Sequence, residues 1–242
     1  SAELKTIMNQ KKDTYLDAQT SASFIEEFYK GAKDAAGGVK IVGGDITGAE
    51  KIFISVAAIG SVKNRKISSR SGAKAGQKIV ISGEHGSSAA GLNILCEKKY
   101  SGLSEKEKKE LISSHLMPQA QLKFSKTVAT NQKNDYAMMD TSDGLADALF
   151  AISEASEVLL EADFVKIPYN KILEKIPNFE DLILYGGEDY GLIATVDEVQ
   201  KGMVVIGEVK SGSGVKMNFE NKTQILTKQI IEEKIYKHFK ER

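Results

Sequence analysis

Acidic residues occur in three short segments of the sequence that also contain glycine or a small hydroxyl residue. Asp45 follows two glycines, Asp140 and Asp143 stand three apart around a threonine and a serine, and residues 186–189 read Gly-Gly-Glu-Asp. Each segment comes after an apolar run with the composition of a β-strand. In α/β folds, ligands bind beyond the carboxyl ends of strands. The placement therefore indicates a ligand site.

The pair Asp140 and Asp143 lies at an expected strand-to-helix turn. Two carboxylates there would repel a phosphate, even though the N–H groups of a helix N-terminus attract it. A bridging Mg²⁺ removes the conflict, because this ion is commonly held by one or two carboxylates together with water and substrate phosphates. The glycines before Asp45 leave room for a phosphate close to the backbone. These features favour a magnesium-nucleotide site.

Structural alternatives stay open at this point. Asp143 could cap the following helix while Asp140 ends a strand. The segment 186–189 could be a tight turn with solvated acids. The segment 83–88, Gly-Glu-His-Gly-Ser-Ser, could receive a phosphate or simply connect a strand to a helix. There is no Walker A sequence and no Gly-x-Gly-x-x-Gly fingerprint at a strand-to-helix turn.

Other classes of function are disfavoured by composition. The 33 basic and 33 acidic residues balance, so nucleic-acid binding is not expected. The apolar runs are shorter than the roughly 20 residues of a membrane helix, and the start lacks a secretory signal, so we expect a cytoplasmic protein. Three histidines without metal-ligand spacing and no Gly-x-Ser-x-Gly disfavour zinc and acyl-transfer chemistry. The single Cys96 lies in an apolar stretch and is predicted to be buried.

The acids must be positioned by alternating helices and strands. A capping box at Ser23 predicts a helix that ends near Gly37, followed by strands at 39–42 and 52–59. The polar, basic stretch 62–76 is the best candidate for a boundary between two lobes. Further strands are expected at 78–82, 136–139, 191–196 and 203–206, with an apolar β-run at 182–184. Further helices are expected around 90–96, at 105–114 after a capping box at Ser104, after Asp143 with Leu145, Leu149 and Ile152 on one face, and in the charged tail 229–242.

Five stretches, taken in order, resemble thiamine-monophosphate kinase. They are VGGDIT at 42–47, SRSGAKAGQKIVISGEHGSSAAGL at 69–92, MMDTSDGLADAL at 138–149, YGGEDYGL at 185–192 and YKHF at 236–239. The resemblance implies an α/β (α+β) chain with the two-lobed fold of aminoimidazole ribonucleotide synthetase. Selenophosphate synthetase and a hydrogenase-maturation protein share that architecture. We expect a partial N-terminal ATP-binding domain at 1–62 and a C-terminal α+β domain at 65–242.

The resemblance also implies an activity and roles for residues. The family transfers the γ-phosphoryl group of ATP directly to thiamine monophosphate to give thiamine diphosphate, so no covalent nucleophile is expected. Implied roles are magnesium ligands for Asp45, Asp140 and Asp143, nucleotide contacts for Gly44, Asp45, Arg70 and Ser142, and thiamine-phosphate contacts for Glu188 and Phe239. The implied partners are ATP, Mg²⁺, thiamine monophosphate and a second copy of the chain.

The sequence departs from the family pattern at several positions. Ile46 replaces a threonine, Gln77 a common aspartate and Gly191 a common glutamate, and 117–121 lacks a proline-arginine pair. The N-terminal lobe is expected to be incomplete, without the family's upstream aspartates. Two alternatives therefore accompany the kinase interpretation. One is a non-catalytic or truncated nucleotide-binding relative, and the other is an ATP-dependent enzyme of the same fold with another small substrate.

Overall fold

A computed structural model describes residues 18–49, 51–62, 65–97 and 99–235. The chain divides into two compact units, an N-terminal unit of residues 1–61 and a C-terminal unit of residues 62–242. In the N-terminal unit, helix α2 runs from Ala18 to Ala35 and is followed by a turn and by chain without regular secondary structure. Ser23 lies inside this helix, so the capping box expected there is wrong. No described helix is both long and apolar enough to cross a membrane.

The two strands expected in the N-terminal unit are also wrong. The described residues of 39–42 and 52–59 form no strand, and apolar side chains such as Val42, Phe53 and Ile59 are exposed. Their β-branched composition favours extended backbone. A strand additionally needs a neighbouring strand to bind its N–H and C=O groups. Within the described residues of this unit, none is paired in that way.

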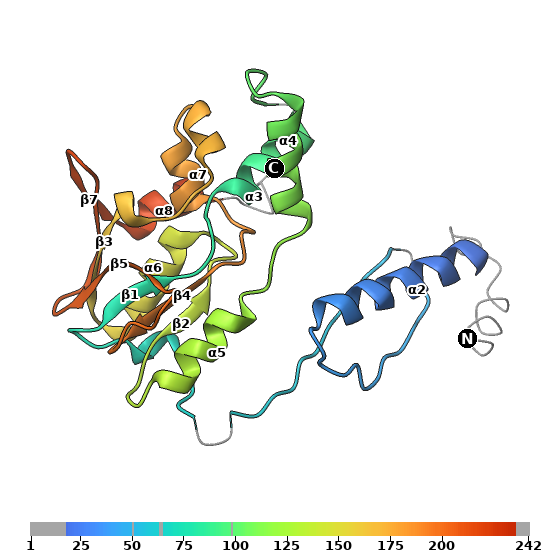
Figure 1. Ribbon diagram of the computed structural model, residues 1–242, viewed down its shortest axis with the longest axis horizontal. Helices are drawn as coiled ribbons and strands as arrows, with labels where there is room; N and C mark the ends of the chain where they lie inside the picture. The colour runs from blue at the N-terminus through green and yellow to red at the C-terminus, as the bar shows by residue number, and fades with distance from the viewer. Residues whose placement is uncertain (1–17, 50, 63–64, 98, 236–242) are drawn as a thin grey trace. The chain divides into compact units, whose positions relative to one another are not determined.

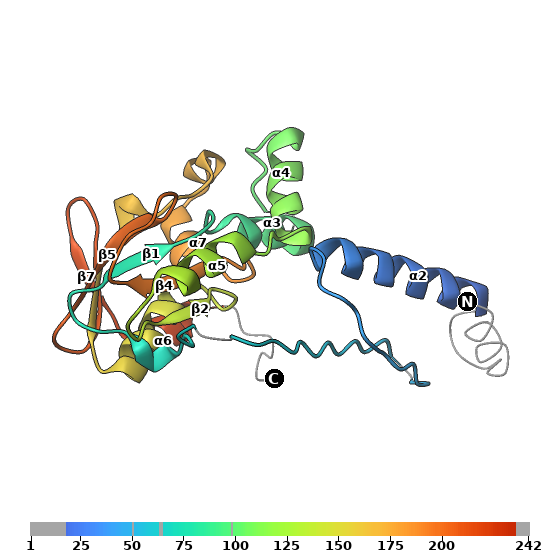
Figure 2. The ribbon, with the colours of Figure 1, turned by 60° about the horizontal axis from the view of Figure 1, so that its bottom comes forward.

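The C-terminal unit is built on a sheet of seven strands in the order β2-β4-β1-β5-β3-β6-β7 (Figures 1 and 2). The strands are β1 Lys78–Ile81, β2 Met138–Asp140, β3 Leu159–Asp163, β4 Leu192–Val196, β5 Val204–Lys210, β6 Gly214–Asn218 and β7 Thr223–Leu226. All neighbours are antiparallel except β3 and β6. The strands at 78–82, 136–139, 191–196 and 203–206 are confirmed with small shifts, whereas β3, β6 and β7 were not expected.

Helices cover both faces of this sheet. The helices are α3 Ser87–Glu97, α4 Glu105–Leu116, α5 Leu122–Asn131, α6 Leu145–Ser156, α7 Phe179–Tyr185 and α8 Lys228–Lys234, with short 3₁₀ helices η1 Arg70–Gly72, η2 Phe164–Lys166 and η3 Lys171–Lys175. Helix α6 packs in the larger core beside Ile79, Ile81 and Ile193, while α5 packs on Val80 and Ala194. Neighbouring residues of β1 thus point to opposite faces, as the period of a strand requires.

The helix predictions have a mixed outcome. The Ser104 capping box is present at the start of α4. Leu145, Leu149 and Ile152 are fully buried on α6, which gives about 1.5–3 kcal/mol each. The expected β-run at 182–184 is wrong, because these residues lie in α7. Short apolar runs fit a buried helix as well as a strand. Cys96 is exposed, because it lies in the last turn of α3, beyond the buried part of that helix.

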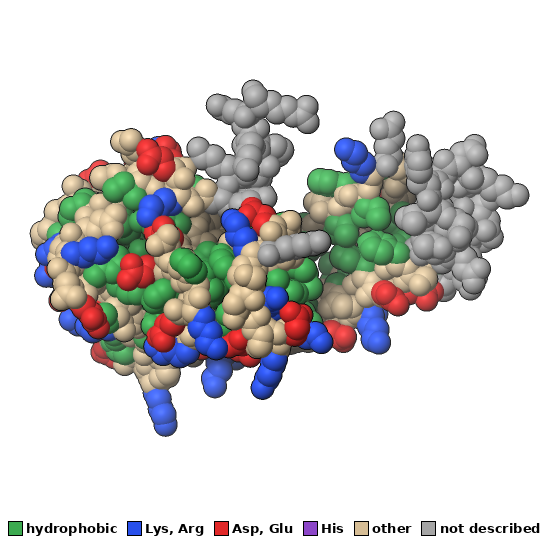
Figure 3. Space-filling model, turned by 90° about the horizontal axis from the view of Figure 1, so that it is seen from above, with side chains coloured by type: hydrophobic (Ala, Val, Ile, Leu, Met, Phe, Trp, Pro, Cys, Tyr) green, Lys and Arg blue, Asp and Glu red, His purple; other side chains and the backbone are tan. Residues whose placement is uncertain are grey.

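Charged side chains are spread over the surface. On the face seen in Figure 3, Lys and Arg alternate with Asp and Glu over the C-terminal unit. The pairs Lys78–Glu208 and Lys234–Asp181 are examples of ion pairs on this unit. The described surface in that view therefore carries mixed charge.

Candidate active site

The turn between β2 and α6 contains both Asp140 and Asp143. Strand β2 ends at Asp140, and α6 begins at Leu145. Gly144 is the N-cap residue of α6 with φ of 113°, and no side chain caps this helix end. The alternative in which Asp143 caps the helix is therefore wrong. Both aspartates are exposed, so solutes can reach their carboxylates.

A second loop, residues 186–191, lies directly against this turn. The N–H of Glu188 donates to the carbonyl of Ser142 at 2.7 Å, and the N–H of Thr141 donates to the carbonyl of Gly191 at 3.0 Å. The antiparallel register explains why the loop contacts the turn, since Asp140 at the end of β2 pairs with Leu192 at the start of β4. The sheet thus joins two acidic loops that are far apart in the sequence. Because the sheet is mostly antiparallel, the strand-end rule for parallel sheets is not the cause.

Electrostatic effects connect the two loops through Tyr190. The pKa of the Tyr190 phenol is raised, first by its hydrogen bond to Glu188, then by burial, and further by the charges of Glu188, Asp140 and Asp143. The pKa of Asp147, four residues after Asp143, is raised by burial and by the Asp143 charge. Asp140, Asp143 and Glu188 therefore form one acidic region of the C-terminal unit.

Arg70 is the basic residue that acts on this region. Its guanidinium lowers the pKa of Asp147, opposing the two effects that raise it. The hydroxyl of Ser156, at the end of α6, donates to the Arg70 carbonyl at 2.7 Å and accepts from the Ala73 N–H at 3.1 Å. A Cβ on Gly72 would lie 2.3 Å from the Tyr136 carbonyl oxygen, so this backbone approach requires glycine. Together these contacts fix η1 beside α6.

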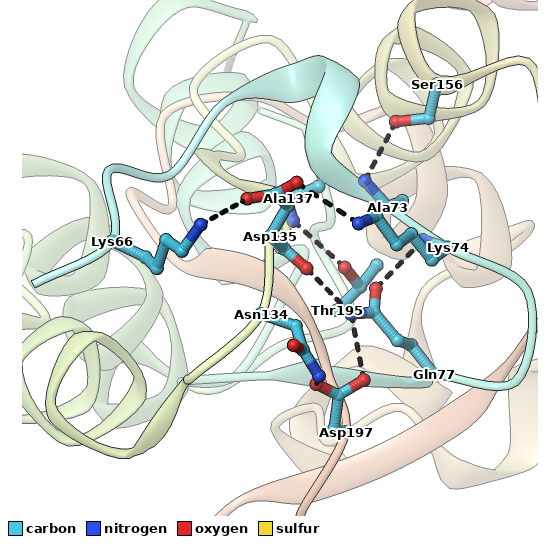
Figure 4. A network of polar contacts seen from close by, with 10 residues as sticks. All are labelled: Lys66, Ala73, Lys74, Gln77, Asn134, Asp135, Ala137, Ser156, Thr195 and Asp197. Carbon is cyan, nitrogen blue, oxygen red and sulfur yellow. Dashed lines mark hydrogen bonds and ion pairs between the residues drawn. The ribbon is translucent and has the colours of Figure 1, made fainter.

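A polar network anchors the chain that follows Arg70 (Figure 4). The side-chain amide of Gln77, only 2% exposed, donates to the Asp135 carbonyl at 2.9 Å and to the Asp197 carboxylate at 3.1 Å, and its oxygen accepts from the Lys74 N–H at 2.9 Å. Lys66 and Lys74 each bind the Asp135 carboxylate at 3.1 Å. An aspartate at position 77 has no proton to donate when ionised. Glutamine therefore suits this network in a way that the common aspartate does not.

The remaining predicted site residues are not among the described residues of the C-terminal unit. Gly44 and Asp45 belong to the N-terminal unit. A Cβ on Gly44 would lie 2.4 Å from the Tyr29 hydroxyl, and the Asp45 carboxylate accepts a hydrogen bond from the Ile46 N–H at 2.8 Å. Phe239 lies outside the described residues. The structure brings together four of the predicted residues, Asp140, Ser142, Asp143 and Glu188. The charge of Arg70 affects the pKa of Asp147, which follows them.

The donors present suit a hard cation such as Mg²⁺. Within the described part of the chain, no three His, Cys, Asp or Glu side chains are close enough to form a complete metal cage. Mg²⁺ does not require one, because it keeps several waters and takes phosphate oxygens beside one or two carboxylates. The exposed pair Asp140 and Asp143 fits that requirement. The acidic region is thus suited to bind magnesium together with a phosphate ligand.

Sequence reasoning missed three residues of this region. Asp147 lies in the first turn of α6, four positions after Asp143, so its place at the start of the expected helix could have revealed it. Asp189 and Tyr190 lie in the stretch YGGEDYGL, but the resemblance implies no role for either. The Asp189 carboxylate accepts from the N–H groups of Gly86 at 2.6 Å and Ser88 at 2.9 Å, at the start of α3. A contact between such distant residues has no local sequence signal.

Comparison with known proteins identifies the family, although no family model matches the sequence. The chain is 33% identical over 240 residues to thiamine-monophosphate kinase of Aquifex aeolicus, covering 93% of this chain and 72% of the relative. It is 32% identical over 234 residues to the Bacillus subtilis enzyme, covering 90% and 70%. The chain belongs to the thiamine-monophosphate kinase family.

A solved structure of this family supports the same assignment. The structure is AaThiL complexed with AMPPCP and TMP, which matches with a TM-score of 0.58 at 32% identity. The structural match covers 71% of this chain and 54% of that chain, so it extends over about half of the solved relative. The expected mixed α/β, synthetase-like fold of thiamine-monophosphate kinases is confirmed.

His85 is a buried histidine directly behind the acidic turn of this family member. Its side chain is only 1% exposed, and burial lowers its pKa to about 4. Its Nε2 has no hydrogen-bond partner among the described residues. A Cβ on Gly191 would lie 2.8 Å from the His85 ring and 3.1 Å from the Thr141 hydroxyl. The absence of a side chain at position 191 therefore leaves the space that the imidazole edge occupies.

His85 is expected to make the stability of the protein fall as the solution becomes acidic. Its pKa is about 4 in the folded chain against 6.5 in the unfolded chain, so between these values only the unfolded chain binds the proton. The contribution is present above pH 6.5 and lost progressively towards pH 4, up to about 3 kcal/mol. Denaturant unfolding at pH 7.5 and pH 5 should show this loss, and His85→Leu should reduce it.

The wild type must be compared with His85→Leu because Asp189 changes the stability with pH in the opposite direction. Burial raises the Asp189 pKa to about 6, so its folded form binds a proton between pH 3.8 and 6 and gains stability as the pH falls. This contribution is common to the wild type and His85→Leu and cancels in their difference. An equal loss of stability in both proteins between pH 7.5 and pH 5 would contradict the role assigned to His85.

Proposed function

We propose that this protein transfers the γ-phosphoryl group of ATP to the phosphate of thiamine monophosphate, forming thiamine diphosphate and ADP with the help of Mg²⁺. The observation that carries the proposal is the joining of two acidic loops, in which the Glu188 N–H binds the Ser142 carbonyl at 2.7 Å beside Asp140 and Asp143. Family membership supports the reaction, as does a relative solved with AMPPCP and TMP.

The residues of the C-terminal unit suit a role in positioning phosphates. Asp140 and Asp143 would hold Mg²⁺, which when bound would neutralise phosphate charge as the phosphoryl group moves. Helix α6 begins immediately after these residues, and its N-terminus carries partial positive charge that favours phosphate oxygens. The guanidinium of Arg70 and the hydroxyl of Ser142 would bind the nucleotide. None of these groups has to form a covalent intermediate.

Other roles in the proposal come from the sequence resemblance. We keep Gly44 and Asp45 as nucleotide and magnesium residues, and Glu188 and Phe239 as residues that contact thiamine phosphate. A carboxylate and an aromatic ring suit a cationic thiazolium and a flat heterocycle. A homodimer and a cytoplasmic location are further predictions of the same resemblance.

The test is a titration followed by a turnover assay on the same sample. Calorimetric titration with AMPPCP should give binding that needs Mg²⁺, and incubation with ATP and thiamine monophosphate should yield thiamine diphosphate. Magnesium-dependent binding without product would instead favour the non-catalytic relative. Product formed only with a different phosphate acceptor would favour another enzyme of this fold. Absence of nucleotide binding would refute the proposal.

A further inference from the structure

The loop 186–191 has an unusual distribution of backbone conformations. Three of its six residues are glycine, yet none of the three has a positive φ. The left-handed conformations fall instead on Glu188, with φ of 66°, and Tyr190, with φ of 50°. Residues with a Cβ disfavour this region, and glycine adopts it at almost no cost. The loop thus has strained backbone at Glu188 and Tyr190, the two positions that carry large side chains.

The three glycines serve a different purpose, which is close backbone contact. A Cβ on Gly186 would lie 2.2 Å from the Leu182 carbonyl oxygen, and one on Gly187 would lie 2.4 Å from the Ser142 carbonyl oxygen. A Cβ on Gly191 would lie 2.9 Å from the Ser82 carbonyl oxygen. The glycines therefore allow the loop to pack closely against its neighbours. They do not occupy the positions with positive φ, where glycine would remove the strain.

Asp189 holds the middle of the loop in place. Its carboxylate binds the N–H groups of Gly86 and Ser88, at 2.6 and 2.9 Å, and so joins the loop to the start of α3. On the other side, the Glu188 N–H is bound by the Ser142 carbonyl. The strained pair is thus supported from two directions. Strained backbone persists where the surroundings hold it, and it is concentrated at positions that bind ligands.

The two side chains on the strained positions form a pair. The Tyr190 hydroxyl donates to a Glu188 carboxylate oxygen at 2.8 Å. The Tyr190 side chain is 40% exposed, and the negative charges of Asp140 and Asp143 act on its hydroxyl. The loop therefore presents an aromatic ring and a carboxylate together, next to the residues that would hold magnesium. An aromatic ring beside a carboxylate favours a flat cation over an anion or an aliphatic ligand.

We propose that Tyr190 is a substrate-binding residue, which together with Glu188 binds the cationic heteroaromatic ring of thiamine monophosphate, and that Asp189 is a positioning residue for this pair. The inference rests on the proposed function and extends it, because it assigns the recognition of the ring to a preformed, strained loop. Tyr190 supplies a ring for stacking and orients the Glu188 carboxylate through its hydroxyl.

Glycine substitution gives a test in which binding and stability respond differently. Tyr190→Gly should remove the ring and relieve the positive φ, so the KM for thiamine monophosphate should rise about tenfold or more while the unfolding midpoint does not fall. The KM for ATP should stay within twofold of the wild type. Glu157→Gly is the matched control, because Glu157 has φ of 54° at the opposite end of α6. It should keep both KM values.

Asp189→Asn tests the positioning role. Its amide nitrogen would face one of the two N–H groups, of Gly86 or Ser88, that the carboxylate now binds, so the loop should lose part of its support. We expect the KM for thiamine monophosphate to rise severalfold with the KM for ATP unchanged. Ser104→Ala is the control, because it removes the side-chain cap of α4, away from the loop, and should lower stability without changing either KM.

The outcomes separate this inference from the proposed function. A wild-type protein that makes no thiamine diphosphate would refute both. If the wild type is active and Tyr190→Gly keeps its KM for thiamine monophosphate within twofold, only the role of Tyr190 is refuted. If Tyr190→Gly lowers the unfolding midpoint, the strain at this position is refuted. Equal changes in both KM values for Asp189→Asn would refute its positioning role.

Discussion

Replacement of Asp143 by asparagine is expected to reduce kcat/KM for the phosphoryl transfer by about a hundredfold to a thousandfold, the loss typical of removing one preorganised charge-stabilising group. A neutral amide oxygen binds Mg²⁺ more weakly than a carboxylate does. Because Asp143 is exposed and does not cap α6, the folded state should be preserved. Steady-state kinetics over a magnesium titration and thermal unfolding measure the two effects.

The same variant has a second readout that does not depend on activity. The Asp143 charge raises the pKa of Asp147, so Asp143→Asn should lower that pKa, which NMR titration of the side chain can follow. Glu154→Gln is a matched acid-to-amide control, because Glu154 is exposed further along α6. It should leave both the kinetics and the Asp147 pKa as in the wild type. Unchanged magnesium dependence in Asp143→Asn would remove Asp143 from the proposed site.

Gly187→Ala is expected to damage both the stability and the activity of the protein. The new Cβ would lie 2.4 Å from the Ser142 carbonyl oxygen, which is backbone and cannot rotate away. To make room, the loop and the acidic turn must separate, which weakens the 2.7 Å hydrogen bond from Glu188 to Ser142. We expect a loss of about 1–3 kcal/mol in unfolding free energy. We also expect a fall in kcat/KM of at least about tenfold for both substrates, since displacement of a positioning element by about 1 Å can cost a hundredfold.

Gly102→Ala provides the comparison for this prediction. Gly102 is exposed, and a Cβ there would meet nothing within 4 Å. That variant should keep wild-type kinetics and lose no stability. Urea unfolding and steady-state kinetics on both variants check the expectation. A Gly187→Ala protein with wild-type kinetics would mean that the two loops need not touch for activity.

The parts of the fold that could be predicted from the sequence have local causes. Helix α6 follows from the spacing of Leu145, Leu149 and Ile152, and the start of α4 follows from the reciprocal contacts of Ser104 and Glu107. The wrong predictions concern properties that depend on distant partners. The runs 39–42 and 52–59 have strand composition, but composition does not supply a neighbouring strand. The run 182–184 is too short for its period to distinguish a strand from α7.

The candidate site shows the same division. Asp140, Asp143 and Glu188 could be selected from residue type and flanking glycines, and the structure brings them together in one region. Which residues support them could not be predicted. Asp189 binds backbone N–H groups 103 and 101 positions away, and the Gln77 amide reaches Asp197 across 120 positions. Such contacts depend on how the sheet is ordered, and strand order has no local signature.

The position of β2 at the edge of the sheet has a consequence for the energetics of ligand binding. This strand has three residues, and among the described residues its only strand neighbour is β4, through the pairs Met138–Ala194, Met139–Ile193 and Asp140–Leu192. Separating so short an edge strand requires far less free energy than unfolding the central strands. A ligand that bridges Asp140 and Glu188 would bind only when β2 is paired with β4. It would therefore raise the free energy needed to separate β2 from the sheet. Part of the binding free energy would then appear as increased order at this edge of the sheet.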